Sequence, residues 1–315
     1  MPDTPDDTVF HAGEQALQRQ DGSREHLARL GARIVRDALP EAHQAFFAQL
    51  PLLVLGAADA RGQPWCGLLE GAPGFVHAPE ASSLRVDALP GADDPLGACL
   101  RPHADVGMLG IELDTRRRNR VNGQVLELDA KGFGVRVEQS FGNCPRYIQL
   151  REPRTQDSPL EARPPLRAAR LQGEAAALVR RADTLFIATH VARGQSGVGV
   201  GAGADASHRG GRSGFVQVDA EGARLAWAEF PGNRYFNTLG NLLLEPRAGL
   251  VFPDFASGDL VHVAGRAEIL DGAAAAAALG GAERAVLLHV EQVIHRPAAL
   301  SRRWRLLEYS PHLGG

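Results

Sequence analysis

The chain has 315 residues, 44% of them apolar, which is enough to bury a sizeable core and to divide into more than one domain. Its 34 basic and 37 acidic residues give a net charge of −3, so nothing in the overall charge favours nucleic-acid binding. Three cysteines without ligand spacing, an acidic N-terminus and no apolar run of the roughly 20 residues that span a bilayer predict a cytoplasmic protein that binds no membrane.

Residues 1–50 are predicted to form an N-terminal helical extension. Apolar residues recur at helical spacing over 11–39, and Pro40 ends this helix. A second short helix is expected over 41–50. From residue 51 the pattern changes to short apolar runs separated by glycine and proline turns, which predicts a β domain over 51–150.

The next part of the chain is predicted to connect two domains. Residues 151–166 are proline-rich and charged, which is typical of a linker. A helix is expected over 167–182, so that 151–182 forms a linker and bridging helix. Short apolar runs separated by turn residues then resume, and a second β domain is predicted over 183–315.

An internal repeat supports this division. The tetrapeptide ARGQ occurs at 60–63 and 192–195, GFV at 74–76 and 214–216, and RVNGQVLEL from Arg120 corresponds to HVAGRAEIL from His262. Self-similarity over this length indicates a duplicated β-barrel domain. The offset rises from 132 to 140 between the first two pairs, so eight residues are added in the second copy.

The stretch GADASHRGGRSGFVQV, residues 203–218, lies within the region of this addition and is predicted to be a glycine-rich loop entering a strand. Glycine lets backbone N–H groups approach a ligand, and the arginine fork suits phosphate. Ser207, His208, Arg209 and Gly210 are therefore predicted to bind a phosphate group. A solvated surface loop is the alternative interpretation.

Other motifs give weaker indications of function. RRRNR, residues 116–120, is expected to be a solvated hairpin turn, although Arg118 and Arg120 would share one sheet face and one of them could reach an anionic cofactor. Cys144 has no evident histidine partner, and no metal-ligand spacing or nucleophile elbow occurs. No metal site is therefore predicted, and the catalytic residues are unknown.

Several segments, including GQPWCGLLEGAPGFV, GNCPRYIQ, DASHRGG, PGNRYFNTLGN and RRWRLLEYSP, together carry a resemblance over nearly the full length. The chain resembles the pyridoxamine 5′-phosphate oxidase-like family of FMN-binding split-barrel proteins, in its bacterial branch with two barrels in tandem. The resemblance implies a mainly β, α+β fold with flanking helices. It further implies two tandem Greek-key split barrels of six strands each, with FMN at the contact between barrels. The whole chain is also expected to form a homodimer.

The resemblance assigns further candidate residues for FMN. The family's asparagine before its phosphate-binding helix matches Asn233, but the basic phosphate ligands of that helix fall on Asn237 and Thr238. This departure suggests that Ser207, His208 and Arg209 supply the missing phosphate contacts.

The segment GNCPRYI adds three more candidates. The resemblance places Asn143, Arg146 and Tyr147 near the cofactor, with lysine more usual in the family at the position of Arg146.

The function predicted from these features is that of an FMN-dependent oxidoreductase acting on an unidentified small-molecule substrate or electron donor. Two alternatives stay open. One is a flavin-binding or carrier protein without its own turnover. The other is a split barrel that binds haem or another ligand instead of flavin.

Overall fold

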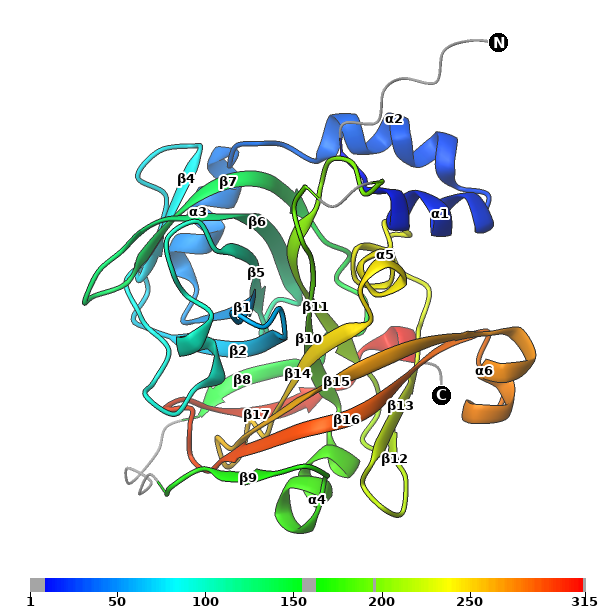
Figure 1. Ribbon diagram of the computed structural model, residues 1–315. Helices are drawn as coiled ribbons and strands as arrows, with labels where there is room; N and C mark the ends of the chain where they lie inside the picture. Colours follow the sequence, from blue (N-terminus) through cyan, green and yellow to red (C-terminus); the bar gives the residue numbers. More distant parts are fainter. Residues whose placement is uncertain (1–8, 155–162, 195–196, 314–315) are drawn as a thin grey trace.

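The computed structural model describes residues 9–154, 163–194 and 197–313, and it is mainly β with flanking helices, which confirms the predicted α+β class (Figure 1). The strands of the first sheet are β1 (Leu52–Ala58), β2 (Pro64–Glu70), β3 (Val76–His77), β4 (Ser83–Val86), β5 (Asp105–Glu112), β6 (Arg117–Leu128) and β7 (Phe133–Gly142). They are ordered β2-β1-β5-β6-β7-β4-β3.

The second sheet repeats this arrangement. Its strands are β10 (Thr184–Val191), β11 (Gly203–Gly210), β12 (Val216–Val218), β13 (Arg224–Ala228), β14 (Arg247–Pro253), β15 (Leu260–Asp271) and β16 (Arg284–Arg296). Their order, β11-β10-β14-β15-β16-β13-β12, is that of the first sheet, and β9 (Leu166–Ala168) adds an eighth strand beside β16. Each sheet therefore exceeds the six strands expected, because the short hairpins β3–β4 and β12–β13 extend it.

The predicted linker contains regular structure. Strand β8 (Leu150–Arg154) pairs with β17 (Arg303–Glu308) in a separate two-stranded sheet, while residues 155–162 of the predicted linker lie outside the described residues. The bridging helix α4 (Gly173–Arg181) is shorter than predicted, because residues 166–168 pair with β16 instead.

The N-terminal extension contains two helices before α3, where a single one was predicted. Helices α1 (Ala12–Gln20) and α2 (Arg24–Ile34) are separated at Gly22, which has a positive φ of 71°. Helix α3 (Glu41–Gln49) agrees with the prediction. The remaining helices are α5 (Asn237–Leu244), α6 (Gly272–Leu279) and the short 3₁₀ segments η1 (Pro95–Ala98) and η2 (Pro311–Leu313).

The predicted glycine-rich loop is wrong for residues 203–210, which form the edge strand β11. Strand β11 is the equivalent of β2 in the second sheet, because Ser207 pairs with Ile187 of β10 in the same way as Gly67 pairs with Leu55 of β1. The polar residues of β11 therefore stand where the first copy has residues of β2, and they are not an addition. The additional length of the second copy lies mainly in the longer connection between Val191 and Gly203. Likewise, β6 begins at Arg117, so most of RRRNR is strand and not turn.

A reciprocal close approach joins the two sheets. Gly107 of β5 faces β11, where an added Cβ would lie 2.7 Å from Cα of Asp205. Gly249, the corresponding residue of β14, faces β2, where a Cβ would lie 2.8 Å from Cα of Trp65 and 2.2 Å from the carbonyl oxygen of Pro64. Buried apolar side chains from both sheets, including Val54, Leu109, Phe186, Val251 and Leu260, fill the space around these contacts.

Among the described residues, no helix is both long and apolar enough to cross a membrane.

The glycine contacts lead to a stability prediction. Gly249→Ala places a methyl group against the backbone of β2, and such overpacking costs about 2–3 kcal/mol of unfolding free energy. Gly97→Ala is the matched control, because a Cβ there meets nothing within 4 Å. Denaturant unfolding should show the loss in Gly249→Ala only, and equal stability of the two variants would contradict the role given to this contact.

Candidate functional site

A cavity of about 310 Å³ lies between the two sheets. Its walls come from β6, the segment after β7, β11 and the segment from the end of β13 into α5. All ten residues predicted to bind the cofactor line it, although they come from distant parts of the chain: Asn143, Arg146, Tyr147, Ser207, His208, Arg209, Gly210, Asn233, Asn237 and Thr238.

Arg118 of β6 and His208 of β11 meet across the cavity wall. Nη1 of Arg118 lies 3.0 Å from Nδ1 of His208, and its Nε donates to the carbonyl oxygen of Cys144 at 2.7 Å. Burial lowers the pKa of His208 well below its ordinary value, and the charges of Arg118 and Arg209 lower it further. The imidazole is therefore neutral near pH 7.

The contact with Arg118 also determines which nitrogen of His208 carries its proton. A guanidinium only donates hydrogen bonds, so Nδ1 accepts and Nε2 carries the proton. Within the described part of the chain, this buried Nε2–H has no hydrogen-bond partner. The site thus contains a donor whose hydrogen bond a ligand oxygen could complete.

Arg118 is further distinguished by its charge environment. Burial lowers its pKa to about 9, and the nearby charges of Arg120 and Arg209 act in the same direction, so it stays cationic at pH 7. In the described ranges, no carboxylate forms an ion pair with Arg118 or with the exposed Arg146. The other four arginines of the cavity are each paired with an acid: Arg120 with Asp205, Arg209 with Glu229, Arg234 with Asp21 and Arg284 with Asp271.

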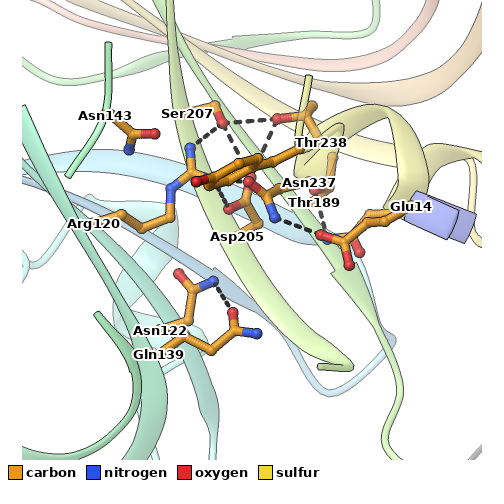
Figure 2. A network of polar contacts seen from close by, with 12 residues as sticks. Glu14, Arg120, Asn122, Gln139, Asn143, Thr189, Asp205, Ser207, Asn237 and Thr238 are labelled. Carbon is orange, nitrogen blue, oxygen red and sulfur yellow. Dashed lines mark hydrogen bonds and ion pairs between the residues drawn. The ribbon is translucent and has the colours of Figure 1, made fainter. Parts of the chain in front are cut away.

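A buried polar network lies beside this pair (Figure 2). Arg120 forms a 2.6 Å ion pair with Asp205, and its Nη2 donates to Oγ of Ser207 at 2.5 Å. Thr238 Oγ1 lies 2.8 Å from Ser207 Oγ, and Nη1 of Arg120 donates to Oδ1 of Asn237 at 2.8 Å. Figure 2 shows these side chains converging from β6, β11 and α5. Ser207, Asn237 and Thr238 are thus hydrogen-bonded to protein groups.

Arg209 and Gly210, both predicted to bind phosphate, have close contacts with protein groups. Arg209 Nε donates to the carboxylate of Glu229 at 2.7 Å, so its charge is already balanced. Gly210 is close to the segment after β7, where an added Cβ would lie 2.0 Å from the carbonyl oxygen of Tyr147. Because Gly210 has no side chain, β11 can pack against the GNCPRYI segment.

That segment provides aromatic and amide groups to the cavity. The rings of Tyr147 and Phe230 stack with centroids 5.1 Å apart, and Tyr147 OH donates to the carbonyl oxygen of Pro231. Asn143 accepts a hydrogen bond from Asn233 at 3.3 Å, while its buried Nδ2 has no partner within the part of the chain that the structure describes. Arg146 is exposed to solvent.

The corresponding position on the other side of the contact between the sheets is filled. Leu68 of β2 stands where β11 has His208, and Leu260 of β15 stands where β6 has Arg118. Both leucines are buried in the apolar cluster between the sheets. Nearby, Asp94 and Arg296 form a 2.6 Å ion pair. The duplicated fold therefore has a basic, open position on one side and an apolar, packed position on the other.

Sequence reasoning underestimated the basic strand β6 and missed the contact of Glu14 in α1 with Asn237 in α5. Arg118 and Arg120 were expected in a turn, although their alternation had indicated a shared sheet face. Glu14, whose carboxyl Oε1 accepts a hydrogen bond from Asn237, gave no signal because its partner is 223 positions away. Trp304 is buried and packs edge to face on Phe255. In the described ranges, no three His, Cys, Asp or Glu side chains gather as metal ligands.

No family model and no curated protein matches the chain. Solved structures match parts of it. A HupZ variant from Group A Streptococcus is 17% identical and the match covers 40% of this chain and 98% of that one, with a TM-score of 0.29. A candidate pyridoxamine 5′-phosphate oxidase from Lactobacillus delbrueckii is 18% identical over 34% of this chain and 98% of its own, with a TM-score of 0.27.

A Clostridium acetobutylicum protein related to general stress protein 26, of the pyridoxinephosphate oxidase family, is 14% identical, covering 42% of this chain and 92% of its own at a TM-score of 0.29. At such identities and TM-scores these similarities carry no argument about function.

Proposed function

We propose that this chain is a tandem pair of split barrels, over 51–150 and 183–315, that binds FMN in the cavity between its sheets and acts as an FMN-dependent oxidoreductase. The observation that carries the proposal is the pairing of Arg118 with neutral His208. A guanidinium without a carboxylate partner in the described ranges and an unpartnered imidazole N–H beside it favour an anionic ligand group such as phosphate.

The other groups of the cavity also fit FMN. Ligand pockets have volumes of about 300–1,000 Å³, so a cavity of about 310 Å³ is at the small end of this range. The amide donor of Asn143 suits a ring carbonyl oxygen, and the aromatic side chains of Tyr147 and Phe230 suit a planar ring system. The cavity therefore has groups that suit the anionic phosphate and groups that suit the aromatic ring of FMN.

The phosphate is assigned to Arg118 and His208, whereas the sequence predicted Ser207, His208, Arg209 and Gly210. Glu229 already balances the charge of Arg209, and Ser207 is hydrogen-bonded to Arg120 and Thr238. A phosphate at Arg209 would have to displace or approach the Glu229 carboxylate, which is electrostatically unfavourable.

When bound, FMN supplies the redox chemistry, and the protein supplies binding, orientation and electrostatics. Arg118 and His208 hold the anionic group, Asn143 orients the polar edge, and the apolar contact between the sheets excludes water from the inner wall. Such a site needs no catalytic acid or base of its own. The small-molecule substrate and the homodimer stay predictions.

The geometry of His208 disfavours the haem alternative. An axial ligand binds iron through an unprotonated ring nitrogen. Here Nδ1 of His208 already accepts from Arg118, and Nε2 carries the proton. His208 could bind iron only after losing this contact.

The phosphate assignment can be tested with two ligands that differ only in that group. Arg118→Ala should weaken FMN binding about 10–100-fold, because a charge-assisted hydrogen bond contributes about 1.5–3 kcal/mol. It should leave riboflavin binding nearly unchanged. Quenching of flavin fluorescence gives both affinities.

Two variants serve as controls for this measurement. Arg209→Ala should have a smaller effect on FMN than Arg118→Ala, because Arg209 is paired with Glu229. Arg305→Ala, on the exposed part of β17, should have none. An Arg118→Ala protein that binds FMN as tightly as the original would contradict the assignment.

The filled counterpart position gives a prediction about stoichiometry. Because Leu68 and Leu260 occupy the places of His208 and Arg118, we expect one FMN per chain. Titration with absorbance detection, against protein concentration from amino-acid analysis, should saturate near one equivalent. Saturation at two equivalents would show that the second position also binds.

Turnover separates an oxidoreductase from a carrier. The FMN-loaded protein, reduced by dithionite or NADPH, should be reoxidised faster by an organic acceptor such as a quinone than by oxygen, as followed by flavin absorbance. Reoxidation by oxygen alone, with no acceptor dependence across a panel of quinones and nitro compounds, would favour the carrier.

A further inference from the structure

Helix α1 belongs to neither sheet, yet it packs closely against α5, which lines the cavity (Figure 1). An added Cβ at Gly13 would lie 2.1 Å from the carbonyl oxygen of Gly240. A Cβ at Gly240 would in turn lie 2.6 Å from the backbone nitrogen of Glu14. The two glycines let the helix backbones touch, and this contact brings Glu14 to the first turn of α5.

The Glu14 side chain is buried there and bonds to two donors. Its Oε2 accepts from the backbone N–H of His11 at 2.8 Å, which is part of the capping box of α1. Its Oε1 accepts from Nδ2 of Asn237, the first residue of α5. Glu14 is only 3% exposed, so water does not compete for these bonds.

The bond from Asn237 has a directional consequence. An asparagine amide has one donor end and one acceptor end. Since Glu14 takes the donor end, Oδ1 of Asn237 faces Nη1 of Arg120. Arg120 in turn contacts Asp205 and Ser207 in the cavity wall. Figure 2 shows this chain of contacts running from α1 through α5 to β6 and β11.

We propose that Glu14 is a positioning residue of the cavity, which through the amide of Asn237 holds Arg120 in place, so that the N-terminal helix forms part of the ligand site. This proposal rests on the proposed function, since the ligand considered is FMN. Glu14 does not line the cavity itself.

The charges around Glu14 make the proposal testable by pH. Burial raises the pKa of its carboxyl to about 8. The bonds from His11 and Asn237 oppose this rise, Asp205 adds to it, and Arg120 opposes it. His11 is the remaining titratable neighbour, and burial lowers its pKa. Above pH 8 Glu14 therefore ionises close to Asp205, with Arg120 as the one cation among these groups.

The raised pKa of Glu14 determines in which direction stability and FMN affinity change with pH. A carboxyl whose pKa is higher in the folded protein than in the unfolded chain stabilises the fold at low pH, and this contribution is lost as pH rises toward 8. A nearby anionic ligand opposes the ionisation of Glu14. The Kd for FMN should therefore rise above pH 8, by at most about tenfold per pH unit.

The experiment compares the unaltered protein with Glu14→Gln and Glu14→Ala between pH 7 and pH 9, by FMN fluorescence. At pH 7 we expect Glu14→Ala to bind FMN about tenfold more weakly. Glu14→Gln, which keeps an acceptor for Asn237, should stay within about threefold of the unaltered protein and lose the rise in Kd that Glu14 causes. Every titratable group other than Glu14 is the same in all three proteins, so the difference between their profiles isolates Glu14.

Glu25→Gln on exposed α2 is the matched control and should change neither the affinity nor its pH profile. Glu14→Ala binding FMN as tightly as the unaltered protein at pH 7 would overturn the positioning role and leave the proposed function intact.

A ligand-free measurement separates the two proposals. The side-chain amide resonance of Asn237 in ¹⁵N spectra should shift between pH 7 and pH 9 in the unaltered protein and stay constant in Glu14→Gln. If FMN fails to bind at pH 7, the proposed function is wrong, and the amide shift still decides whether Glu14 controls Asn237. An Asn237 side-chain resonance at the same position in Glu14→Ala and in the unaltered protein would overturn the role given to Glu14.

Discussion

The structure depends on the contact between the two sheets, in which a glycine of each sheet packs against the edge strand of the other sheet. Gly107 faces Asp205, and Gly249 faces Trp65, with no side chain between the backbones. Because the two contacts are reciprocal, the sheets meet along equivalent strands, and apolar residues from both pack around them. This contact fixes where β6 meets β11, and hence where the cavity forms. A side chain at either glycine would separate the two walls of the site.

The same contact has different chemistry on its two sides. On one side, Arg118 and His208 line the cavity. On the other, Leu260 and Leu68 occupy the equivalent positions and pack as core. A duplicated scaffold provides two equivalent positions. Polar substitutions on two strands can open one position to a ligand, while the other position stays apolar and stabilises the fold. Apolar packing at the closed position compensates for the unpaired polar groups at the open one.

Buried charge is the main cost of the open side. Removing Arg120 and Asp205 from water is unfavourable, and their ion pair offsets the cost only with good geometry and further hydrogen bonds. Ser207, Thr238 and Asn237 supply those bonds, and Asn237 is in turn held by Glu14. The network satisfies the buried groups of this wall and does not include Arg118, a buried cation of the cavity that has no acidic partner in the described ranges.

The sequence by itself determined the fold class and the internal repeat, because alternating apolar residues, turn residues and matching segments are local signals. Together with the family resemblance, it also indicated ten of the residues that line the cavity. It did not determine that residues 203–210 form an edge strand, since their glycines and polar side chains read as a loop until the other sheet buries them. It also could not show that Arg209 is paired and Arg118 is not, or that Glu14 reaches Asn237. Those outcomes depend on contacts between residues far apart in the chain, and only the packing of one sheet and one helix against another decides them.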